Sequence, residues 1–413
     1  MADRVTVIGW DGTPLSAAAR WALGAATLVA GAPHHLALPD IPAGAERVRL
    51  GSVSVAAGRI ARHRGTAVVL ADGDPGFFGV VRTLRAPEHG LEVEVHPAVS
   101  AVAAAFARAG MPWDDARLVV AHSRTLRRAV NVCRAHPKVA VLTSPGAGPA
   151  ELALLLTGVH RTFVICEALG TEREQTTVIT SDKVPDHSWR DPNVVIVVGG
   201  SSPSAPTGTH RGDGWIAGRE PGYPPPTRGW ALPAAAYAGP APLPGAAPRA
   251  SESTQLRALQ LARLGPRTGD LVWDIGSGGG ALAVEAAGFG AAVIAVDRDR
   301  EACQRAELAA RRFGVRLQTV CGPAPHVLED LPEPDVVRVG GGGVGTVTAV
   351  ADRRPGRIVT HAVTRDEAEA LGSALAERGY AVECALLQSV ELSTRTWAES
   401  ERAVVFLVSG VRE

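Results

Sequence analysis

Glycines and acids in the second half of the chain have the types and spacing of a nucleoside-binding unit. Residues 273–280 read WDIGSGGG, and a second apolar run, VIAVD, ends at Asp297. Glycines spaced two apart let the backbone turn tightly and approach a ligand, and an acid roughly 20 residues further on can accept both ribose hydroxyls. The pattern therefore predicts a strand, a glycine loop, a helix and a second strand. Its candidate ligand contacts are Gly276, Gly278, Gly280 and Asp297.

Asp274, two residues before the first glycine, indicates which ligand this loop takes. Dinucleotide enzymes usually keep that position apolar and leave the helix N-terminus free for a pyrophosphate. An acid there suits a cationic ligand without phosphate, such as S-adenosylmethionine, because it can bind the ammonium group. The pattern thus favours a methyltransferase domain, with an NAD-binding unit and a purely structural glycine turn as the alternatives.

Two loops in the first half also follow strand-like runs. The run 5–8 is followed by GWDG, and the run 67–71 is followed by DGDPGFFG at 72–79. Loops at the carboxyl ends of parallel strands are where α/β sheets bind ligands. Gly73 and Pro75 would give a rigid turn that exposes Asp74 at the mouth of a crevice. The residues alone favour a plain turn with a capping aspartate over a binding site.

Apolar strand-like runs alternate with alanine-rich helical stretches in both halves, which predicts parallel sheets covered by helices. In the first half the runs are 5–8, 67–71, 91–96, 117–121, 139–143, 162–166 and 194–198. In the second half they are 271–274, 293–297, 317–320, 336–339, 357–360, 380–387 and 403–408. The last two have no helix between them, which fits a doubly wound sheet that ends in an antiparallel edge strand.

A change in composition after residue 200 divides the chain. With 413 residues, 46% of them hydrophobic, two domains are the natural expectation. Residues 201–250 are rich in Pro, Gly, Ala and Ser, so they cannot hold a regular helix or a central strand. We predict domains at 1–200 and 251–413 with this linker between them. Aromatic residues in the linker indicate that part of it packs on a domain surface.

Charge, hydropathy and cysteine usage exclude several classes of partner. The formal net charge is +0, which gives no global electrostatic case for nucleic acid or an anionic membrane. No apolar run reaches the roughly 18 residues of a membrane span, and the N-terminus enters a strand-like run directly, without a signal peptide. The five cysteines have no metal-ligand spacing, which is typical of reduced cytosolic thiols. We expect a cytoplasmic protein without a bound metal.

Four motifs in the first half together resemble the tetrapyrrole methylases. They are VIGWDG at 7–12, GDPGFFG at 73–79, HPAVSA at 96–101 and AGMPW at 109–113, in the order and spacing of that family. The resemblance runs from about Val5 to Gly200. It implies an α/β fold of two small lobes that bind S-adenosylmethionine between them.

With this half in view, the whole chain resembles the fused precorrin-6Y methyltransferases (decarboxylating) of cobalamin biosynthesis. In that family a tetrapyrrole methylase precedes a Rossmann-like class I S-adenosylmethionine-dependent methyltransferase domain. The second half adds VGGG at 339–342 and AVT at 362–364, where the family has a GGG turn and an AVT strand end. The implied fold class is therefore α/β in both parts.

The resemblance implies two sets of cofactor contacts and a pocket for a precorrin, a small tetrapyrrole with many carboxylates. In the first domain the cofactor contacts are Trp10, Asp74, Phe77, Ser100 and Ala101. In the second they are Asp274, Gly276, Gly278, Gly280 and Asp297, with Gly322 to Ala324 beside the adenine. Cationic groups suit the substrate, which makes Arg124, Arg127 and His361 candidates; a solvated helix face and a satisfied histidine are the alternatives. No catalytic residue is assigned, because methyl transfer to a nucleophilic carbon mainly needs orientation.

By resemblance, the first half methylates carbon 5 of the ring, and the second methylates carbon 15 and releases carbon dioxide from the ring C acetate. Such methylases are often dimers, so we expect a homo-oligomer. The chain departs from the family in a sparse polar lead-in to the second domain, in His361 for an Asn, and in Asp72 for a Ser. Asp72 beside a polyanion is unfavourable, so we expect it to face away or to bond to the backbone.

Two other hypotheses stay open at this point. One is a single working methylase in the first half, joined to a diverged second domain that is non-catalytic or regulatory; the eroded lead-in motivates it. The other is an NAD-binding module with a proline-rich tether.

Overall fold

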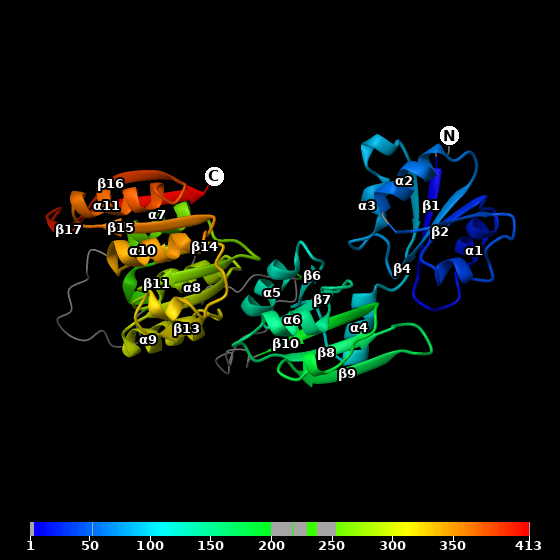
Figure 1. Ribbon diagram of the computed structural model, residues 1–413, viewed down its shortest axis with the longest axis horizontal. Coiled ribbons are helices and arrows are strands. Elements are labelled where there is room, and N and C mark those ends of the chain that lie inside the picture. Colours follow the sequence, from blue (N-terminus) through cyan, green and yellow to red (C-terminus); the bar gives the residue numbers. More distant parts are fainter. Residues whose placement is uncertain (1–3, 52, 200–216, 218–228, 238–252, 413) are drawn as a thin grey trace. The chain divides into compact units, whose positions relative to one another are not determined.

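The computed structural model describes residues 4–51, 53–199, 217, 229–237 and 253–412, and its chain forms two compact units (Figure 1). The N-terminal unit comprises residues up to 113 together with 118–124 and 140–198. The C-terminal unit comprises 114–117, 125–139 and the residues from 199 onward. The predicted linker 201–250 lies outside the described residues except for 217 and 229–237.

The N-terminal unit begins with a parallel five-stranded sheet of order β3-β2-β4-β1-β5. Its strands are β1 Arg4–Trp10, β2 Leu28–Gly31, β3 Glu46–Arg49, β4 Ala67–Asp72 and β5 Glu92–His96. Its helices are α1 Ala17–Gly24, α2 Val53–Arg62 and α3 Val80–Leu84. Alternate residues of the central strands pack on α1 at one face and on α2 and α3 at the other, as a doubly covered parallel sheet requires.

A second lobe of this unit is built on a sheet of order β6-β7-β10-β8-β9. Its elements are α4 Ala101–Ala109, β6 Arg117–Val120, β7 Lys138–Leu142, α6 Pro149–Leu155, β8 Thr162–Glu167, β9 Gln175–Thr180 and β10 Asn193–Val198. Strand β8 pairs antiparallel with both β10 and β9. The expectation of parallel pairing is wrong here, because β9 returns directly from β8 without a crossover helix.

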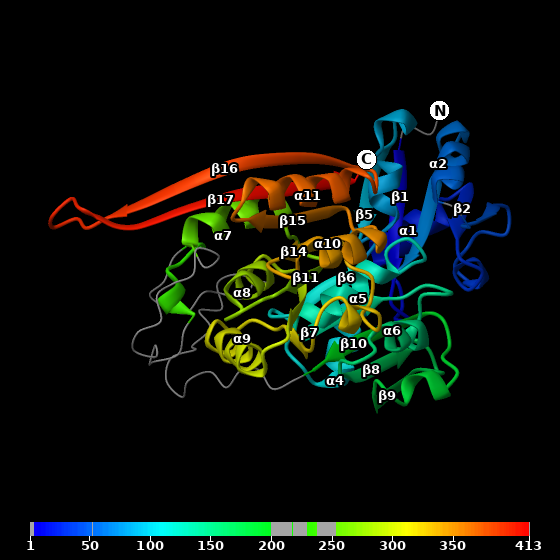
Figure 2. The same cartoon turned by 60° about the vertical axis from the view of Figure 1, so that its left-hand side comes forward.

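The C-terminal unit contains a seven-stranded sheet of order β13-β12-β11-β14-β15-β17-β16. Its strands are β11 Leu271–Ile275, β12 Ala292–Asp297, β13 Gln318–Cys321, β14 Val336–Val339, β15 Arg357–Ala362, β16 Tyr380–Leu392 and β17 Glu399–Arg412. The first five in spatial order are parallel, and β17 pairs antiparallel with both β15 and β16. All seven predicted strands and the antiparallel edge are confirmed. Figure 2 shows the β16–β17 hairpin extending well past the neighbouring strands of its own sheet.

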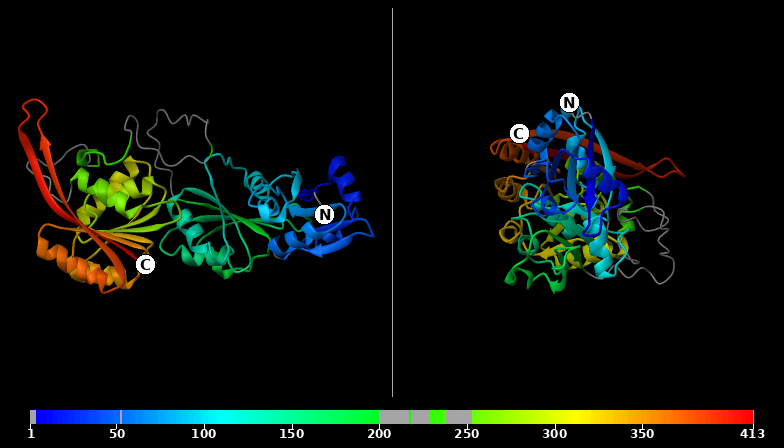
Figure 3. Two further views of the ribbon diagram at one scale, coloured as in Figure 1. Left: turned by 90° about the horizontal axis from the view of Figure 1, so that it is seen from above. Right: turned by 90° about the vertical axis from the view of Figure 1, so that its right-hand side faces the viewer.

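Helices cover both faces of this sheet, which gives two apolar cores. The helices are α7 Thr254–Leu264, α8 Ala281–Gly288, α9 Arg300–Arg312, α10 Gly343–Asp352 and α11 Arg365–Ala376. Helices α7, α8 and α9 pack on one face and α10 and α11 on the other, as the left view of Figure 3 shows. Helix α5, Leu126–Ala135, also belongs to this unit and packs near β12. None of the helices in the described part of the chain is long and apolar enough to cross a membrane.

Residues 229–237, the described end of the predicted linker, lie against the C-terminal unit. Glu285 of α8 is fully buried and accepts hydrogen bonds from the Tyr237 hydroxyl, from the Ala231 amide at 3.1 Å and from Arg257 at 3.1 Å. The Tyr237 ring stacks on Phe313 with centroids 4.9 Å apart. This segment therefore packs as its aromatic residues indicate, while the domain boundaries near 200 and 250 stay predictions.

Candidate active sites

The loops after β1, β4 and β5 pack backbone against backbone. A Cβ on Gly9 would lie 2.2 Å from the carbonyl oxygen of Gly73, and one on Gly73, which has φ +60°, would lie 2.9 Å from the amide of Ala101. The Gly73 amide donates to the Trp10 carbonyl over 2.7 Å. Only glycine fits these positions. The loop Gly73–Asp74–Pro75 and the start of α4 therefore meet in a cradle lined by main-chain groups.

A fourth loop joins the same cradle from the second lobe of the N-terminal unit. A Cβ on Gly12, whose φ is +89°, would lie 1.8 Å from the carbonyl oxygen of Gly170 in the β8–β9 loop. The Gly170 amide donates to Glu174, which also pairs with Arg108 of α4. The two lobes are thus in main-chain contact beside the end of β1.

All five predicted contacts of the first domain lie at the ends of β1, β4 and β5. Trp10 ends β1, and Asp74 accepts the Gly76 amide over 2.8 Å in the loop after β4. Phe77 stacks edge-on against Phe78, which has a left-handed φ of +51°. Ser100 accepts the Ala103 amide over 3.1 Å as the N-cap of α4, and Ala101 is the first residue of that helix.

Asp11 organises these loops, although it is not among the contacts predicted from the sequence. Its carboxylate accepts the Thr13 amide and hydroxyl at 3.0 and 2.6 Å, and it accepts the Val99 amide at 3.2 Å. Burial raises its pKa, but the hydrogen bonds from Thr13 and Val99 outweigh burial, so the pKa lies below its usual value. The charged carboxylate therefore ties the loop after β1 to the loop after β5.

Asp72 corrects another expectation. Its carboxylate bonds to side chains rather than to the backbone, because Oδ1 contacts the Nε2 atoms of His34 and His35 at 2.8 and 3.0 Å. No sequence pattern predicted a role for His34 and His35. Two adjacent histidines after a short strand form no recognisable motif. The sequence therefore gives no sign that the fold brings them to Asp72 at the end of β4.

In the C-terminal unit the glycine loop after β11 has the strained geometry that its sequence predicts. Gly276, Gly278 and Gly280 have φ values of +69°, +56° and +76°. A Cβ on Gly280 would lie 2.6 Å from the Cβ of Ala306 in α9, whereas nothing lies within 4 Å of one on Gly278. Gly280 therefore serves close packing between helices, and the other two let the backbone turn before α8.

Asp297, at the end of β12, is bound to this loop. Its Oδ2 accepts the Gly278 amide over 2.9 Å, and its Oδ1 accepts the Asp299 amide over 2.9 Å. The Gly322 amide, after β13, donates to the Asp297 carbonyl over 2.9 Å, and Ala324 follows it in a loop that packs on the core. The carboxyl ends of β11, β12 and β13 therefore bring Gly276, Asp297 and Gly322 to one edge of the sheet.

Asp274 lies beneath the loop and is paired with an arginine. It is fully buried, and Arg338 donates from one Nη1 to Asp274 Oδ1 at 3.0 Å and to the Gly276 carbonyl at 2.9 Å. Burial raises the pKa of Asp274, and the arginine partly offsets that rise. Among the described residues Asp274 Oδ2 and Arg338 Nε have no hydrogen-bond partner. Asp274, which the sequence predicts to bind the ammonium group of the cofactor, is therefore already paired with the guanidinium of Arg338 on β14.

His361, a candidate substrate ligand, lies beside this pair. Burial, and then the charge of Arg338, lower its pKa from 6.5 to about 4. Its Nδ1 lies 3.4 Å from the amide nitrogen of Gln260, a buried residue of α7. The imidazole is therefore neutral at pH 7 and cannot supply positive charge to a carboxylate, although it can still donate or accept a hydrogen bond.

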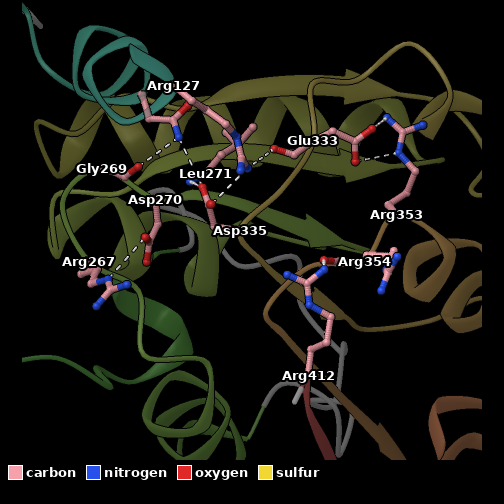
Figure 4. Close-up of polar contacts among 11 residues, drawn as sticks. Arg127, Arg267, Gly269, Asp270, Leu271, Glu333, Asp335, Arg353, Arg354 and Arg412 are labelled. Atoms are coloured by element: carbon pink, nitrogen blue, oxygen red, sulfur yellow. Dashed lines mark hydrogen bonds and ion pairs between the residues drawn. The ribbon is translucent and has the colours of Figure 1, made fainter. Parts of the chain in front are cut away.

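The two candidate arginines occupy different positions. Arg124 is exposed in the loop before α5. Arg127 forms an ion pair with Asp335 at 3.0 Å and donates to the Glu333 carbonyl at 2.6 Å (Figure 4). Asp335 immediately precedes β14 and also accepts the Leu271 amide at 2.7 Å, so Arg127 lies at the amino-terminal edge of the C-terminal sheet. That edge is opposite to the one that carries Asp297.

Two glycine cradles at the carboxyl ends of parallel strands, one followed by an acid at the end of the next strand, define a nucleoside-binding α/β protein of methyltransferase type. Two family models match the chain. Residues 12–185 match the tetrapyrrole (corrin/porphyrin) methylases, and residues 252–408 match the precorrin methyltransferase domain.

Curated relatives extend the match over most of the chain. A precorrin-6Y C(5,15)-methyltransferase (decarboxylating) of Sinorhizobium is 33% identical over 327 residues, which cover 74% of this chain and 70% of that protein. The protein of the same name from Mycobacterium tuberculosis is 30% identical over 397 residues, or 91% of this chain and 90% of its own. A solved C-terminal domain of precorrin-6Y C5,15-methyltransferase from Rhodobacter capsulatus is 31% identical, with a TM-score of 0.35 and coverage of 44% and 97%.

The chain belongs to the family of precorrin-6Y C(5,15)-methyltransferases (decarboxylating). It is therefore an enzyme, a C-methyltransferase whose cofactor is S-adenosylmethionine, and its α/β fold class is the expected one. The NAD-binding hypothesis is set aside by this membership.

Proposed function

We propose that this chain methylates a precorrin at carbons 5 and 15 and removes the carboxyl group of its ring C acetate as carbon dioxide. The N-terminal half acts at carbon 5, and the C-terminal half acts at carbon 15 and decarboxylates. The observation that carries the proposal is the presence of two separate main-chain cradles, each at the carboxyl ends of parallel strands. The names of the relatives, which cover both halves, support the same substrate.

In the N-terminal half the cofactor lies against the main chain of the cradle. The loops after β1, β4 and β5 pack main chain against main chain at Gly9 and Gly73, which brings the ends of the three strands close together. The proposed contacts are Trp10, Asp74, Phe77, Ser100 and Ala101. The left-handed Phe78 beside Phe77 is a strained residue of the kind that clusters at ligand sites.

In the C-terminal half Asp297 binds the ribose hydroxyls, and Gly276, Gly278 and Gly280 turn the loop that faces the cofactor. Each carboxylate oxygen of Asp297 accepts one backbone amide, which orients the group and leaves further lone pairs for hydroxyls. Gly322 and Ala324 lie beside the adenine. Asp274 and Arg338 contact the amino-acid end of the cofactor together. The aspartate then binds the ammonium group and the arginine binds the carboxylate.

The proposed substrate ligands are Arg124 and His361. Arg124 is exposed, which leaves its guanidinium able to meet a peripheral carboxylate. His361 lies next to the cofactor edge of the C-terminal sheet and acts as a neutral hydrogen-bonding group. Arg127 is held by Asp335 at the other edge, which favours a structural role for it.

Both halves work mainly by holding the acceptor carbon in line with the sulfonium methyl group. Orientation of this kind supplies about 7–11 kcal/mol of the barrier. In the decarboxylation the bond between the acetate methylene and its carboxyl carbon breaks, carbon dioxide leaves, and a proton takes its place on the remaining carbon. A buried, low-polarity environment favours loss of the carboxylate charge.

One observation favours a second candidate, in which only the N-terminal half transfers methyl groups and the C-terminal domain is non-catalytic or regulatory. Arg338 places a permanent cation against Asp274, within the loop that would receive a cationic cofactor. Weak or absent cofactor binding by the C-terminal half follows from this candidate.

The protein works in the cytoplasm as a homo-oligomer, with no nucleic acid or membrane partner. The support for association is the β16–β17 hairpin, which projects from the sheet and exposes Leu386, Val390, Leu392 and Val404. Apolar side chains gathered on a projecting element are typical of contact surfaces.

Calorimetric titration with S-adenosylhomocysteine tests the two-site proposal. We expect two sites per chain in the wild type, one in Gly73→Val, which fills the N-terminal cradle, and one unchanged site plus one weakened site in Asp297→Ala. Gly90→Ala is the matched control, because Gly90 also has φ +60° but no atom within 4 Å of an added Cβ. One site in the wild type, lost in Gly73→Val, would favour the second candidate.

A further inference from the structure

Three titratable side chains outside the proposed cofactor contacts meet at the end of β4. Asp72 Oδ1 lies 2.8 Å from Nε2 of His34 and 3.0 Å from Nε2 of His35. Asp72 is the register partner of Trp10 on β1, whose ring centroid lies 6.0 and 5.8 Å from the two imidazoles. The next two residues along the chain, Gly73 and Asp74, belong to the cradle itself.

One hydrogen bond, from the Ala32 amide, fixes where the proton of His35 lies. Its Nδ1 accepts the Ala32 amide over 3.2 Å, so a neutral imidazole carries its hydrogen on Nε2, toward Asp72. His35 is only 1% exposed, which holds the ring in this orientation. A metal ion would need the Nε2 lone pair that this arrangement removes. The group of His34, His35 and Asp72 is therefore better suited to holding a carboxylate than to binding a metal.

His34 differs from His35 in being open to solvent. Its side chain is 46% exposed, and it hydrogen-bonds Asp72 through Nε2. When Nε2 carries the hydrogen toward the carboxylate, the lone pair of Nδ1 faces away from Asp72. An imidazole oriented by a carboxylate in this way is the common arrangement of a general base. The two imidazole contacts outweigh the effect of burial and lower the pKa of Asp72, which keeps it ionised.

We propose that His34, oriented by Asp72, is the base that accepts the proton lost from the bridge carbon when the N-terminal half methylates it. The inference rests on the proposed function of that half and deepens it. The electron pair of the enamine carbon forms the new bond to the methyl group, and the carbon–sulfur bond breaks to give S-adenosylhomocysteine. The electron pair of the carbon–hydrogen bond then restores the ring double bond, and the proton passes to Nδ1 of His34.

Asp72 and His35 are positioning residues in this step. The carboxylate stabilises the imidazolium that forms on His34, and His35 holds the carboxylate from the buried side. Trp10 connects the group to the cradle, because its ring lies against both imidazoles and the residue itself ends β1. The base thus lies next to the proposed cofactor contacts.

The test is single-turnover transfer from S-adenosyl-[methyl-¹³C]methionine to carbon 5 of the precorrin, with full-length protein and with substrate carrying hydrogen or deuterium at that carbon. We expect His34→Ala to slow formation of the methylated product about 10²–10⁴-fold and to show a primary isotope effect larger than that of the wild type. Added imidazole should restore part of the rate. Asp72→Asn should also raise the isotope effect, without rescue by imidazole.

Two controls separate chemistry from structure. S-adenosylhomocysteine affinity should stay within twofold of wild type in both variants, and His160→Ala, which removes an exposed histidine elsewhere in the N-terminal unit, should behave as the wild type. Wild-type rates and isotope effects in His34→Ala would overturn the inference and leave the proposed function standing. Lost cofactor affinity without imidazole rescue would also overturn it, by giving the histidines a structural role. A wild-type protein that transfers no methyl group to carbon 5 would overturn the proposed function and this inference together.

Discussion

At the scale of single residues, main-chain geometry determines which positions must be glycine. Gly9, Gly12 and Gly73 sit where any side chain would collide with the main chain of another loop. The sequence shows these glycines, but the residues alone favoured a plain turn at the loop of Gly73, and only the family resemblance implied cofactor contacts there. It does not show that Gly12 meets Gly170, because that contact joins loops far apart in the chain.

The partner of Asp274 is the clearest limit of sequence reasoning at this scale. The sequence identified Asp274 before the glycine loop but not its partner. Arg338 lies 64 residues further on, and only the pairing of β11 with β14 sets the two side by side. The same is true of His34 and His35, which the β2–β4 pairing brings to Asp72. Side-chain partners across a parallel sheet have no local sequence signal.

Asp297→Ala should weaken binding of S-adenosylhomocysteine in the C-terminal site by about 1–3 kcal/mol, because two buried hydroxyl contacts are lost. Calorimetry on the full chain, with the N-terminal site as an internal reference, measures the change. Equal affinity in the variant and the wild type would remove Asp297 from the site.

Asp274→Ala should destabilise the C-terminal unit by about 3–5 kcal/mol, because it leaves the Arg338 guanidinium buried without its partner. The double change Asp274→Leu with Arg338→Leu removes both charges and should recover most of that loss. Urea unfolding of the two variants makes the comparison. A double variant no more stable than Asp274→Ala would contradict the buried-pair account.

Gly280→Ala should cost about 1–3 kcal/mol more than Gly278→Ala, although both glycines have a positive φ. The added methyl meets Ala306 at Gly280 and open space at Gly278. Denaturant midpoints measured side by side give the difference. A similar cost at both positions would mean that α8 and α9 move apart readily.

At the scale of elements, most strands that form an apolar run were predictable, and the polar strands β3 and β9 were not. The seven strands of the C-terminal sheet were all read from the sequence. The missed strands β2 and β3 have four residues each, and β9 is a polar edge strand with mostly exposed side chains. Strands β6, β13 and β14 are equally short and were predicted, so length alone does not explain the misses; β3 and β9 are largely polar and exposed and show no apolar run.

His136, the residue after α5, gives the C-terminal unit a pH dependence. Burial, then Arg117 and Arg316, lower its pKa from 6.5 to about 4. The unfolded chain therefore binds the extra proton between pH 6.5 and 4, and folding stability falls as the pH drops through that range. His136→Phe should reduce the loss of stability between pH 7 and pH 4 by about 3 kcal/mol.

Urea unfolding at several pH values measures this effect. His160→Phe, which changes an exposed histidine, is the control and should keep the pH dependence of the wild type. A pH profile that is the same in His136→Phe and in the wild type would show that His136 titrates normally in the folded protein.

At the scale of the whole molecule, two methyltransferase folds lie on one chain in the order that the motifs predicted. The two-lobed first part and the doubly wound second part each contain their own cradle, and we propose one cofactor site in each. The sequence left open whether the second half works, because its polar lead-in is sparse, and the pairing of Arg338 with Asp274 adds to that question. That question belongs to chemistry on the substrate rather than to the fold.

The most direct test of the double-methylase account is to incubate the wild-type protein with the precorrin substrate and S-adenosyl-[methyl-¹³C]methionine and to identify the product by carbon NMR and mass spectrometry. The account predicts two labelled methyl groups per ring, at carbons 5 and 15, and loss of one carbon dioxide from the ring C acetate. A single label at carbon 5 with the acetate intact would contradict it and would show that only the N-terminal half transfers methyl groups.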